Sequence, residues 1–336
     1  MKTLKIAYCV VFGISLVIVL LYCYLNFMIK PPEVSKPEQT PPPPTQSETA
    51  QPTESQQPEE EEPDPTPTPT PLVRRDQVYT CLIFGMDDGY GNTDTIMVAT
   101  FDVPGKKIGL MSIPRDTVVS LDHSAAFNKI NAAHARGGTQ QLRDEVAELL
   151  GIPIDYYVKV RLAAFERLVD LVGGVYFDVP VDMHYFDPDQ DLLIDLTAGP
   201  QTLNGEQAMQ LVRFRQDNTG AGYGDTGRAH TQQEFLKAML TQVLSGASLS
   251  DVPGLVDIVR NYVEIDKELS VNDMIYFGRE LVGMDIGSAI QTTTLPGDWK
   301  SPYIWVNKDA ALTAINELLN PYTTELTEEN VEFFAP

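Results

Sequence analysis

The spacing of apolar side chains divides the chain into three regions with different patterns. Residues 6–28 are apolar without a single charge, and residues 31–71 show no apolar periodicity. The rest of the chain alternates between apolar periods of about two, typical of half-buried strands, and about 3.6, typical of amphipathic helices. We therefore expect an apolar segment, an unstructured linker and a folded body, in that order.

The apolar segment is long enough to span a bilayer as one helix. Lys2 and Lys5 precede it, whereas Lys30 and then an acidic tract follow it. The basic amino-terminal flank predicts that this end lies in the cytoplasm. Residues 1–30 are therefore predicted to form a short cytoplasmic tail and a single-pass transmembrane anchor. A cleaved signal peptide is the alternative, but its apolar region is normally shorter and ends at a small-residue cleavage site.

Residues 31–71 hold 14 of the 25 prolines of the chain and a run of glutamates. Such a composition cannot bury a core and favours extended polyproline II structure. At about 3.1 Å per residue, the segment could extend on the order of 100 Å. We expect a disordered tether between the anchor and a body that comprises residues 72–336.

The body mixes strand-like and helix-like segments. Strands are expected at 79–86, 95–103, 108–113, 154–160, 175–181, 288–295 and 302–306, with an irregular hairpin over 182–203. Helices are expected at 139–150, 162–172, 204–211, 228–245, 252–263, 271–283 and 309–319. This mixture predicts an α/β (α+β) fold in which a central mixed β-sheet is sandwiched between helices.

The formal net charge of −23 excludes nonspecific nucleic-acid binding, which needs a basic surface. Cys81 is the one cysteine of the three that lies beyond the apolar segment, so the body has neither a disulfide nor a zinc–thiolate site and Cys81 is expected to be a buried apolar residue. The glycines between 85 and 91 lead into a strand instead of a helix, which argues against a dinucleotide loop.

Three arginines stand close together in this acidic chain, within the segment RFRQDNTGAGYGDTGRAHTQQ. Arg213 and Arg215 flank Phe214, so an extended backbone would place both guanidinium groups on one face. After a glycine-rich loop, Arg228 and Gln232 share one face of a predicted helix near its amino end. Guanidinium groups and helix amino ends both favour phosphate oxygens. The segment is interpreted as a phosphate clamp, and the alternative is that these arginines form surface ion pairs.

Six blocks carry a resemblance to a known family: LIFGMDDGYGNTDTIMV, SIPRDT, KINAAHARGG, LVDLVGGVYFDV, LNGEQAMQLVRFR and GYGDTGRAHTQQ. In this order, over roughly residues 79–245, they resemble the LytR-CpsA-Psr family of bacterial cell-wall enzymes. The resemblance implies that residues 72–336 form an extracytoplasmic catalytic domain. It also implies transfer of a glycopolymer from a polyprenyl-pyrophosphate carrier at the cytoplasmic membrane onto peptidoglycan, with formation of a phosphodiester.

The resemblance also assigns roles to individual residues. It implies that the pyrophosphate is bound by Arg115, Arg213, Arg215, Arg228 and Gln232, and that Mg²⁺ (or Mn²⁺) is held by Asp87 and Asp94. Asp94, Arg115 and Arg228 would be the catalytic residues, with Asp94 as the base that takes the acceptor's proton. Asp225 and Asn92 would support the site.

Two positions depart from the family pattern. Asn92-Thr93-Asp94 stands where the family often has Arg-Ser-Asp, and Thr231 replaces an arginine that often precedes the paired glutamines. Two other functions therefore stay open. The first is hydrolysis of polyprenyl pyrophosphate with water as the nucleophile, either as the main reaction or as a side activity. The second is a non-catalytic, polyprenyl-phosphate-binding regulator of the envelope. Leu168, Val172, Phe235 and Met239 have the apolar character that a lipid slot would need, although ordinary core packing explains their helical spacing better.

Overall fold

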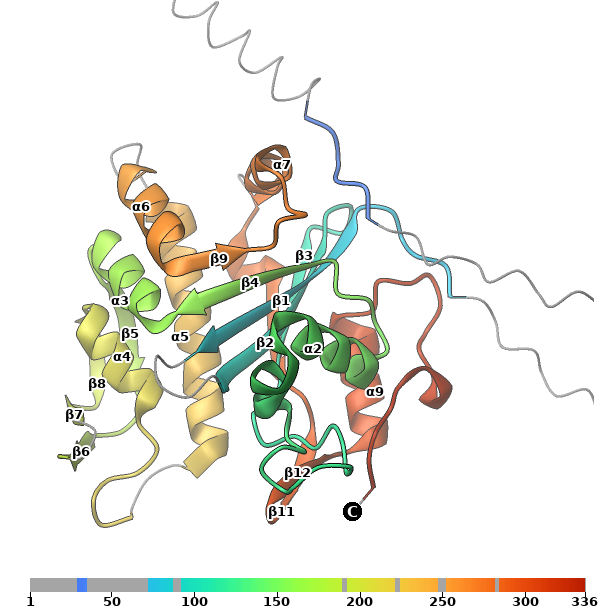
Figure 1. Cartoon of the computed structure of the whole chain (residues 1–336). Coiled ribbons are helices and arrows are strands. Elements are labelled where there is room, and N and C mark those ends of the chain that lie inside the picture. The colour runs from blue at the N-terminus through green and yellow to red at the C-terminus, as the bar shows by residue number, and fades with distance from the viewer. Residues whose placement is uncertain are drawn as a thin grey trace, which may run out of the picture.

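The computed structural model describes residues 29–34, 72–86, 92–188, 192–220, 224–246, 252–281 and 284–335. At its centre lies a six-stranded sheet in the order β10-β3-β2-β1-β4-β9 (Figure 1). The strands are β1 (Val78–Met86), β2 (Thr93–Asp102), β3 (Lys107–Ser112), β4 (Tyr156–Arg161), β9 (Val263–Ile265) and β10 (Ile290–Thr294). The expected strands of the first half thus form within two residues of their predicted positions.

The sheet is mixed. β1 pairs in parallel with β4, and β3 pairs in parallel with β10, while β2 runs antiparallel to both β1 and β3. β1, β3, β4 and β10 therefore all point toward the same edge of the sheet, which we call the carboxyl edge. This confirms the predicted central mixed sheet.

One face of the sheet is covered by α2 (Ala133–Leu150) and α9 (Lys308–Leu318) (Figure 1). Leu82 and Phe84 of β1 point to this face and are fully buried against both helices, as the period of two requires. α2 is interrupted at Gly137 and Gly138, so its regular part begins where the sequence predicted a helix. The helix ends at Gly151, whose φ of 65° suits glycine.

A second core lies beside the sheet. It is built from α3 (Leu162–Leu171), β5 (Val175–Val179), β6 (Met183–Asp187), β7 (Leu192–Leu196), β8 (Gly199–Leu203), α4 (Gly205–Arg213) and α5 (Gly224–Gly246). The remaining elements are α6 (Val252–Tyr262), α7 (Val271–Leu281), α8 (Ile286–Ala289), β11 (Gly297–Lys300), β12 (Tyr303–Val306) and 3-10 turns at Ile130–Ala132 and Glu328–Asn330.

The irregular hairpin predicted over residues 182–203 is partly wrong. β6 and β7 do form a hairpin, but the segment after it, GPQTL, is a separate strand that returns to pair with β5. This strand carries few apolar side chains, so its pairing depends on a partner more than twenty residues earlier and leaves little local signal.

Residues 29–34, which cover the end of the region assigned to the tail and anchor (1–30) and the start of the tether, lie against the body. Ile29 is only 4% exposed and packs with Tyr79, Tyr156 and Tyr276 in an aromatic cluster beside α7. The Tyr79 hydroxyl donates a hydrogen bond to the carbonyl of Pro32 at 3.2 Å. Residues 31–34, which the sequence assigned to the tether, therefore contact the body.

The predicted anchor, residues 6–28, and residues 35–71 of the tether lie outside the described residues. Within the described ranges, no helix combines the length and the apolar character that a bilayer crossing requires.

A buried ion pair fixes the start of the body. Arg74 bonds to Asp155 with both side chains only 4% exposed, and Asp155 also accepts hydrogen bonds from the backbone and hydroxyl of Thr80 at 2.7 and 2.9 Å. The pair joins the segment before β1 to the segment before β4. It therefore ties residues 72–77 to the central sheet.

Candidate functional site

Three of the residues that the sequence singled out lie at the carboxyl edge of the sheet. Arg115 follows the end of β3 and Asn92 precedes β2. Asp94 is the second residue of β2, where the register with β1 shifts between Thr93 and Thr95. Asp87, directly after β1, and the side chain of Asp94 lie outside the described residues. Open sheets bind ligands beyond the carboxyl ends of their parallel strands, so the fold places these residues where a ligand site is expected.

Asn131 connects the Arg115 loop to the start of β2. Its backbone N–H donates to the carbonyl of Arg115 at 3.2 Å, and its carbonyl accepts from the Thr93 hydroxyl at 3.3 Å. The Arg115 side chain is 34% exposed, and its Nε lies 3.7 Å from a carboxylate oxygen of Asp116. Asp116 is also bonded to Lys129 at 2.7 Å, so this carboxylate lies between two cations.

The segment around Phe214 differs from its prediction in detail. α4 begins at the capping box of Asn204 and Gln207 and continues through Arg213, so this arginine ends a helix and is not in an extended segment. The backbone turns extended at Phe214, whose ring is 1% exposed in the second core. Arg213 and Arg215 are both exposed on either side of it. The buried ring therefore acts as an anchor for two outward-facing arginines.

α5 begins at Gly224, four residues before its predicted start, so Asp225 lies inside its first turn. The side chain of Asp225 lies outside the described residues. Two glutamines dock the helix: Gln232 Nε2 donates to the carbonyl of Val212 at 2.7 Å, and Gln233 Nε2 donates to the Thr294 hydroxyl at 2.7 Å. The first bond joins α5 to α4 beside Arg213, and the second joins it to the last residue of β10.

Arg228 is half-buried one helical turn before Gln232. Because Gln233 is bonded at the carboxyl edge, the turn that carries Arg228 is held close to that edge. In Figure 1 the arrowheads of β1 and β4 point toward the same side. Thr231, which replaces a family arginine, is 3% exposed and is packed into the structure.

The structure adds residues that the sequence did not single out. Arg161 ends β4 directly beside Met86, the last residue of β1, so it stands at the carboxyl edge next to the loop that carries Asp87. Asn131 and Gln233 position neighbouring segments, as described above. The only hint of Arg161 in the sequence is its position as a charged residue at the end of the predicted strand YYVKVR.

The apolar residues considered for a lipid slot are core residues. Phe235 and Met239 are buried in the second core, and Leu168 and Val172 pack against it. His134 packs its ring 5.6 Å from the ring of Phe84, which agrees with a structural role. Among the side chains that the structure describes, no group of three or more His, Cys, Asp or Glu residues could hold a metal ion.

Comparison with known proteins identifies the family. The model of the LytR_cpsA_psr family matches residues 44–326. The chain belongs to the LytR_cpsA_psr family. This confirms the resemblance carried by the six sequence blocks.

Among the relatives of this LytR_cpsA_psr protein are two named polyisoprenyl-teichoic acid–peptidoglycan teichoic acid transferases. TagV of Bacillus subtilis is 32% identical over 55% of this chain and 49% of its own length, and TagU of Enterococcus faecalis is 32% identical over 58% and 63%. The chain thus matches about half to two thirds of the length of these relatives. The crystal structure of B. subtilis TagV superimposes with a TM-score of 0.59 and 26% identity over 74% of this chain and 98% of that one. A structure titled "TagT bound to LI-WTA" has the same TM-score and identity, and covers 74% of this chain and 91% of that one.

Proposed function

We propose that this protein is a membrane-anchored phosphotransferase that moves a glycopolymer from a polyprenyl-pyrophosphate carrier onto peptidoglycan and forms a phosphodiester. The names of the relatives support transfer of a glycopolymer to peptidoglycan. The apolar segment with its basic flanks supports an anchor with a cytoplasmic amino terminus and an extracytoplasmic body.

The docking of α5 is the observation that carries the proposal. Its two glutamines fix the turn of Arg228 between the end of α4, which carries Arg213, and the end of β10. This docking supports a site in which arginines from three separate segments of an otherwise acidic protein act on one pyrophosphate. A pyrophosphate needs several cations in fixed positions, and preorganised guanidinium groups supply them without reorganisation during the reaction.

The reaction is a substitution at phosphorus. An acceptor hydroxyl oxygen bonds to the phosphorus next to the glycan, and the bond from this phosphorus to the bridging oxygen breaks. The polyprenyl phosphate leaves with that oxygen, and the hydroxyl proton passes to a carboxylate, for which Asp94 is the candidate. Arg115, Arg213, Arg215 and Arg228 neutralise the charge that accumulates on the phosphate oxygens, and the second amide hydrogen of Gln232 is available to one of them.

A divalent cation suits the residues at the start of this site. Asp87 and Asp94 flank the connection between two adjacent antiparallel strands, since Met86 pairs with Thr93 and Gly85 with Thr95. Carboxylate oxygens are the ligands that Mg²⁺ and Mn²⁺ prefer. These two residues would hold the ion, which would supply additional charge neutralisation at the pyrophosphate.

The test uses the full chain in detergent micelles. It is incubated with a polyprenyl-pyrophosphate-linked oligosaccharide and a peptidoglycan oligomer, with Mg²⁺ or with a chelator, and mass spectrometry detects the phosphodiester-joined product. We expect metal-dependent product that falls at least about 100-fold in Arg228→Ala, the scale of losing one preorganised charge donor. Arg260→Ala, an exposed arginine of α6, is the matched control and should retain wild-type activity.

The alternatives give different products. Cleaved donor without a joined product would establish a hydrolase. Tight donor binding that Arg228→Ala abolishes, without any chemistry, would establish a binding protein, and two relatives that carry regulatory names make this outcome informative. Asp94→Ala separates chemistry from binding, because it should stop turnover and leave donor binding largely intact.

A further inference from the structure

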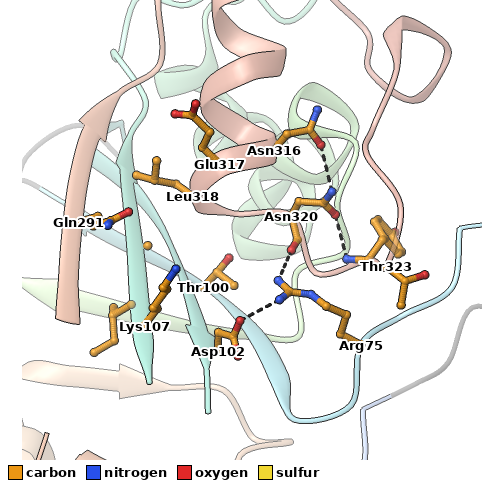
Figure 2. Close-up of a pocket in the computed structure, with 13 residues that line it drawn as sticks. Arg75, Thr100, Asp102, Lys107, Gln291, Asn316, Glu317, Leu318, Asn320 and Thr323 are labelled. Atoms are coloured by element: carbon orange, nitrogen blue, oxygen red, sulfur yellow. Dashed lines mark hydrogen bonds and ion pairs between the residues drawn. The ribbon is translucent and has the colours of Figure 1, made fainter. Parts of the chain in front are cut away.

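A polar pocket of about 340 Å³ lies away from the candidate site (Figure 2). It is enclosed by the end of β2, the beginning of β3, the edge strand β10, the last turn of α9 and the loop that follows α9. β3 begins in the pocket at Lys107 and ends at the carboxyl edge at Ser112. Five steps of about 3.4 Å place the two ends roughly 17 Å apart, so the pocket is separate from the arginine site.

The walls of the pocket are held in place by hydrogen bonds. Arg75 donates to Asp102 Oδ2 at 2.7 Å and to the carbonyl of Asn320 at 2.5 Å, and Asn320 is bonded in turn to Asn316 at 3.0 Å (Figure 2). Gly109 also lines the pocket, and β3 packs tightly against α9 there, because a Cβ at this position would lie 2.0 Å from the carbonyl oxygen of Leu318. The pocket is thus preformed, and none of these contacts needs a ligand.

Other polar groups in the lining have no partner in the described part of the chain. Lys107, Gln291 and Glu317 are exposed, and within the described residues no hydrogen bond or ion pair engages their polar ends. These groups include both donors and acceptors. A ligand that enters the pocket can therefore bond to them by displacing water, without breaking a bond inside the protein.

The charge and size of the pocket select the ligand class. Arg75 and Lys107 balance Asp102 and Glu317, so the lining has no net charge and favours neither a polyanion nor a cation. Few apolar walls are available for a lipid tail. A sugar hydroxyl both donates and accepts, and the volume lies at the small end of the range of about 300–1,000 Å³ for ligand sites.

We infer that this pocket binds one or two neutral sugar residues of a glycan at a distance from the transfer site. The source of that glycan rests on the proposed function, which involves two: the acceptor glycan of peptidoglycan and the glycopolymer of the donor. A second point of attachment would raise the effective concentration of a long glycan at the site. The chemistry common to the two is a hydroxyl-rich sugar ring, which is the group that the pocket would recognise.

Saturation-transfer NMR and calorimetric titration of the full chain in detergent test this inference. The probes are an N-acetylglucosamine tetramer, which represents the acceptor type, and a glucose tetramer, which represents a neutral polymer. We expect one of them to bind with a Kd between about 0.1 and 5 mM, the scale of a few hydrogen bonds. The double variant Lys107→Ala/Glu317→Ala should weaken this binding at least tenfold, and Gln291→Trp should block the pocket.

The matched control is Lys300→Ala/Glu325→Ala, two exposed charges that do not line the pocket. It should bind as the unaltered chain does, and the circular dichroism of all variants should agree. Binding of neither tetramer would overturn the inference. So would binding that survives in the pocket variants but disappears in Arg228→Ala, because the sugar would then occupy the transfer site. If Arg228→Ala loses transfer but still binds the tetramer, the two sites are separate. If the pocket binds the tetramer but neither the unaltered chain nor any variant shows transfer activity, only the proposed function is refuted.

Discussion

Phe214 offers a sharp test of how the arginine site is held. Its ring is 1% exposed in the second core, between two exposed arginines. Removing a fully buried phenylalanine side chain costs about 3–5 kcal/mol through lost apolar burial and the cavity left behind. In a body of this size, about 1 kcal/mol corresponds to roughly 2–4 °C in Tm. Phe214→Ala should therefore lower the Tm by about 6–20 °C.

The same residue type supplies the control. Phe186 of β6 is 55% exposed, so Phe186→Ala removes less than half of the burial of about 1.5–3 kcal/mol available to such a side chain and should cost about 1 kcal/mol. Thermal unfolding followed by circular dichroism compares the two variants. If Phe214→Ala were no more destabilised than Phe186→Ala, the ring would not be an anchor and the assignment would be refuted.

A conservative variant separates anchoring from stability. Phe214→Leu keeps most of the apolar volume and should cost less than about 1.5 kcal/mol. It nevertheless changes the support for the backbone between Arg213 and Arg215. We expect a loss of affinity for the pyrophosphate donor at a temperature where the variant is fully folded. Unchanged donor affinity in the folded variant would mean that these arginines do not depend on the ring.

Three further predictions follow from local geometry. Gly109→Ala should lower the free energy of unfolding, measured with denaturant, by about 1–3 kcal/mol or more, because the new Cβ would overlap a carbonyl of α9. Gly278→Ala in α7 is the control: the space around this glycine is open, so the change should raise the free energy of unfolding by up to about 1 kcal/mol. Arg74→Ala should lower the free energy of unfolding by about 3–5 kcal/mol, because it leaves the buried carboxylate of Asp155 without its cation. Lys308→Ala removes one member of a largely exposed ion pair and should lower it by less than about 1 kcal/mol. Equal losses in the two variants would contradict the buried pairing. Burial raises the pKa of the Cys81 thiol to about 12. Alkylation of this thiol at pH 8, measured by peptide mass spectrometry, should therefore be about 10³-fold slower in the folded protein than in the unfolded chain. The rate should rise as the pH approaches 12.

Local sequence determined most of the body's elements. The strands of the first hairpin and the amphipathic helices carry strong periodicities and end at glycines such as Gly151, so their positions could be predicted within a few residues. The six blocks determined the family, because their order and spacing are specific even without structural data. The mixed sheet followed from the alternation of helices and strands.

Only the tertiary structure decided which segments meet. The strand GPQTL, the contact of residues 31–34 with the aromatic cluster and the pocket at Lys107 depend on partners distant in sequence. Arg161 likewise reaches the carboxyl edge through its register with Met86, which no local pattern encodes. The physical reason is that periodicity reports which face of a segment is buried, whereas pairing, register and pocket shape arise from packing between segments. The sequence alone therefore pointed to the arginines as candidate ligands of a pyrophosphate. Only the fold showed that Gln232 and Gln233 dock α5, the helix that carries Arg228, beside the sheet.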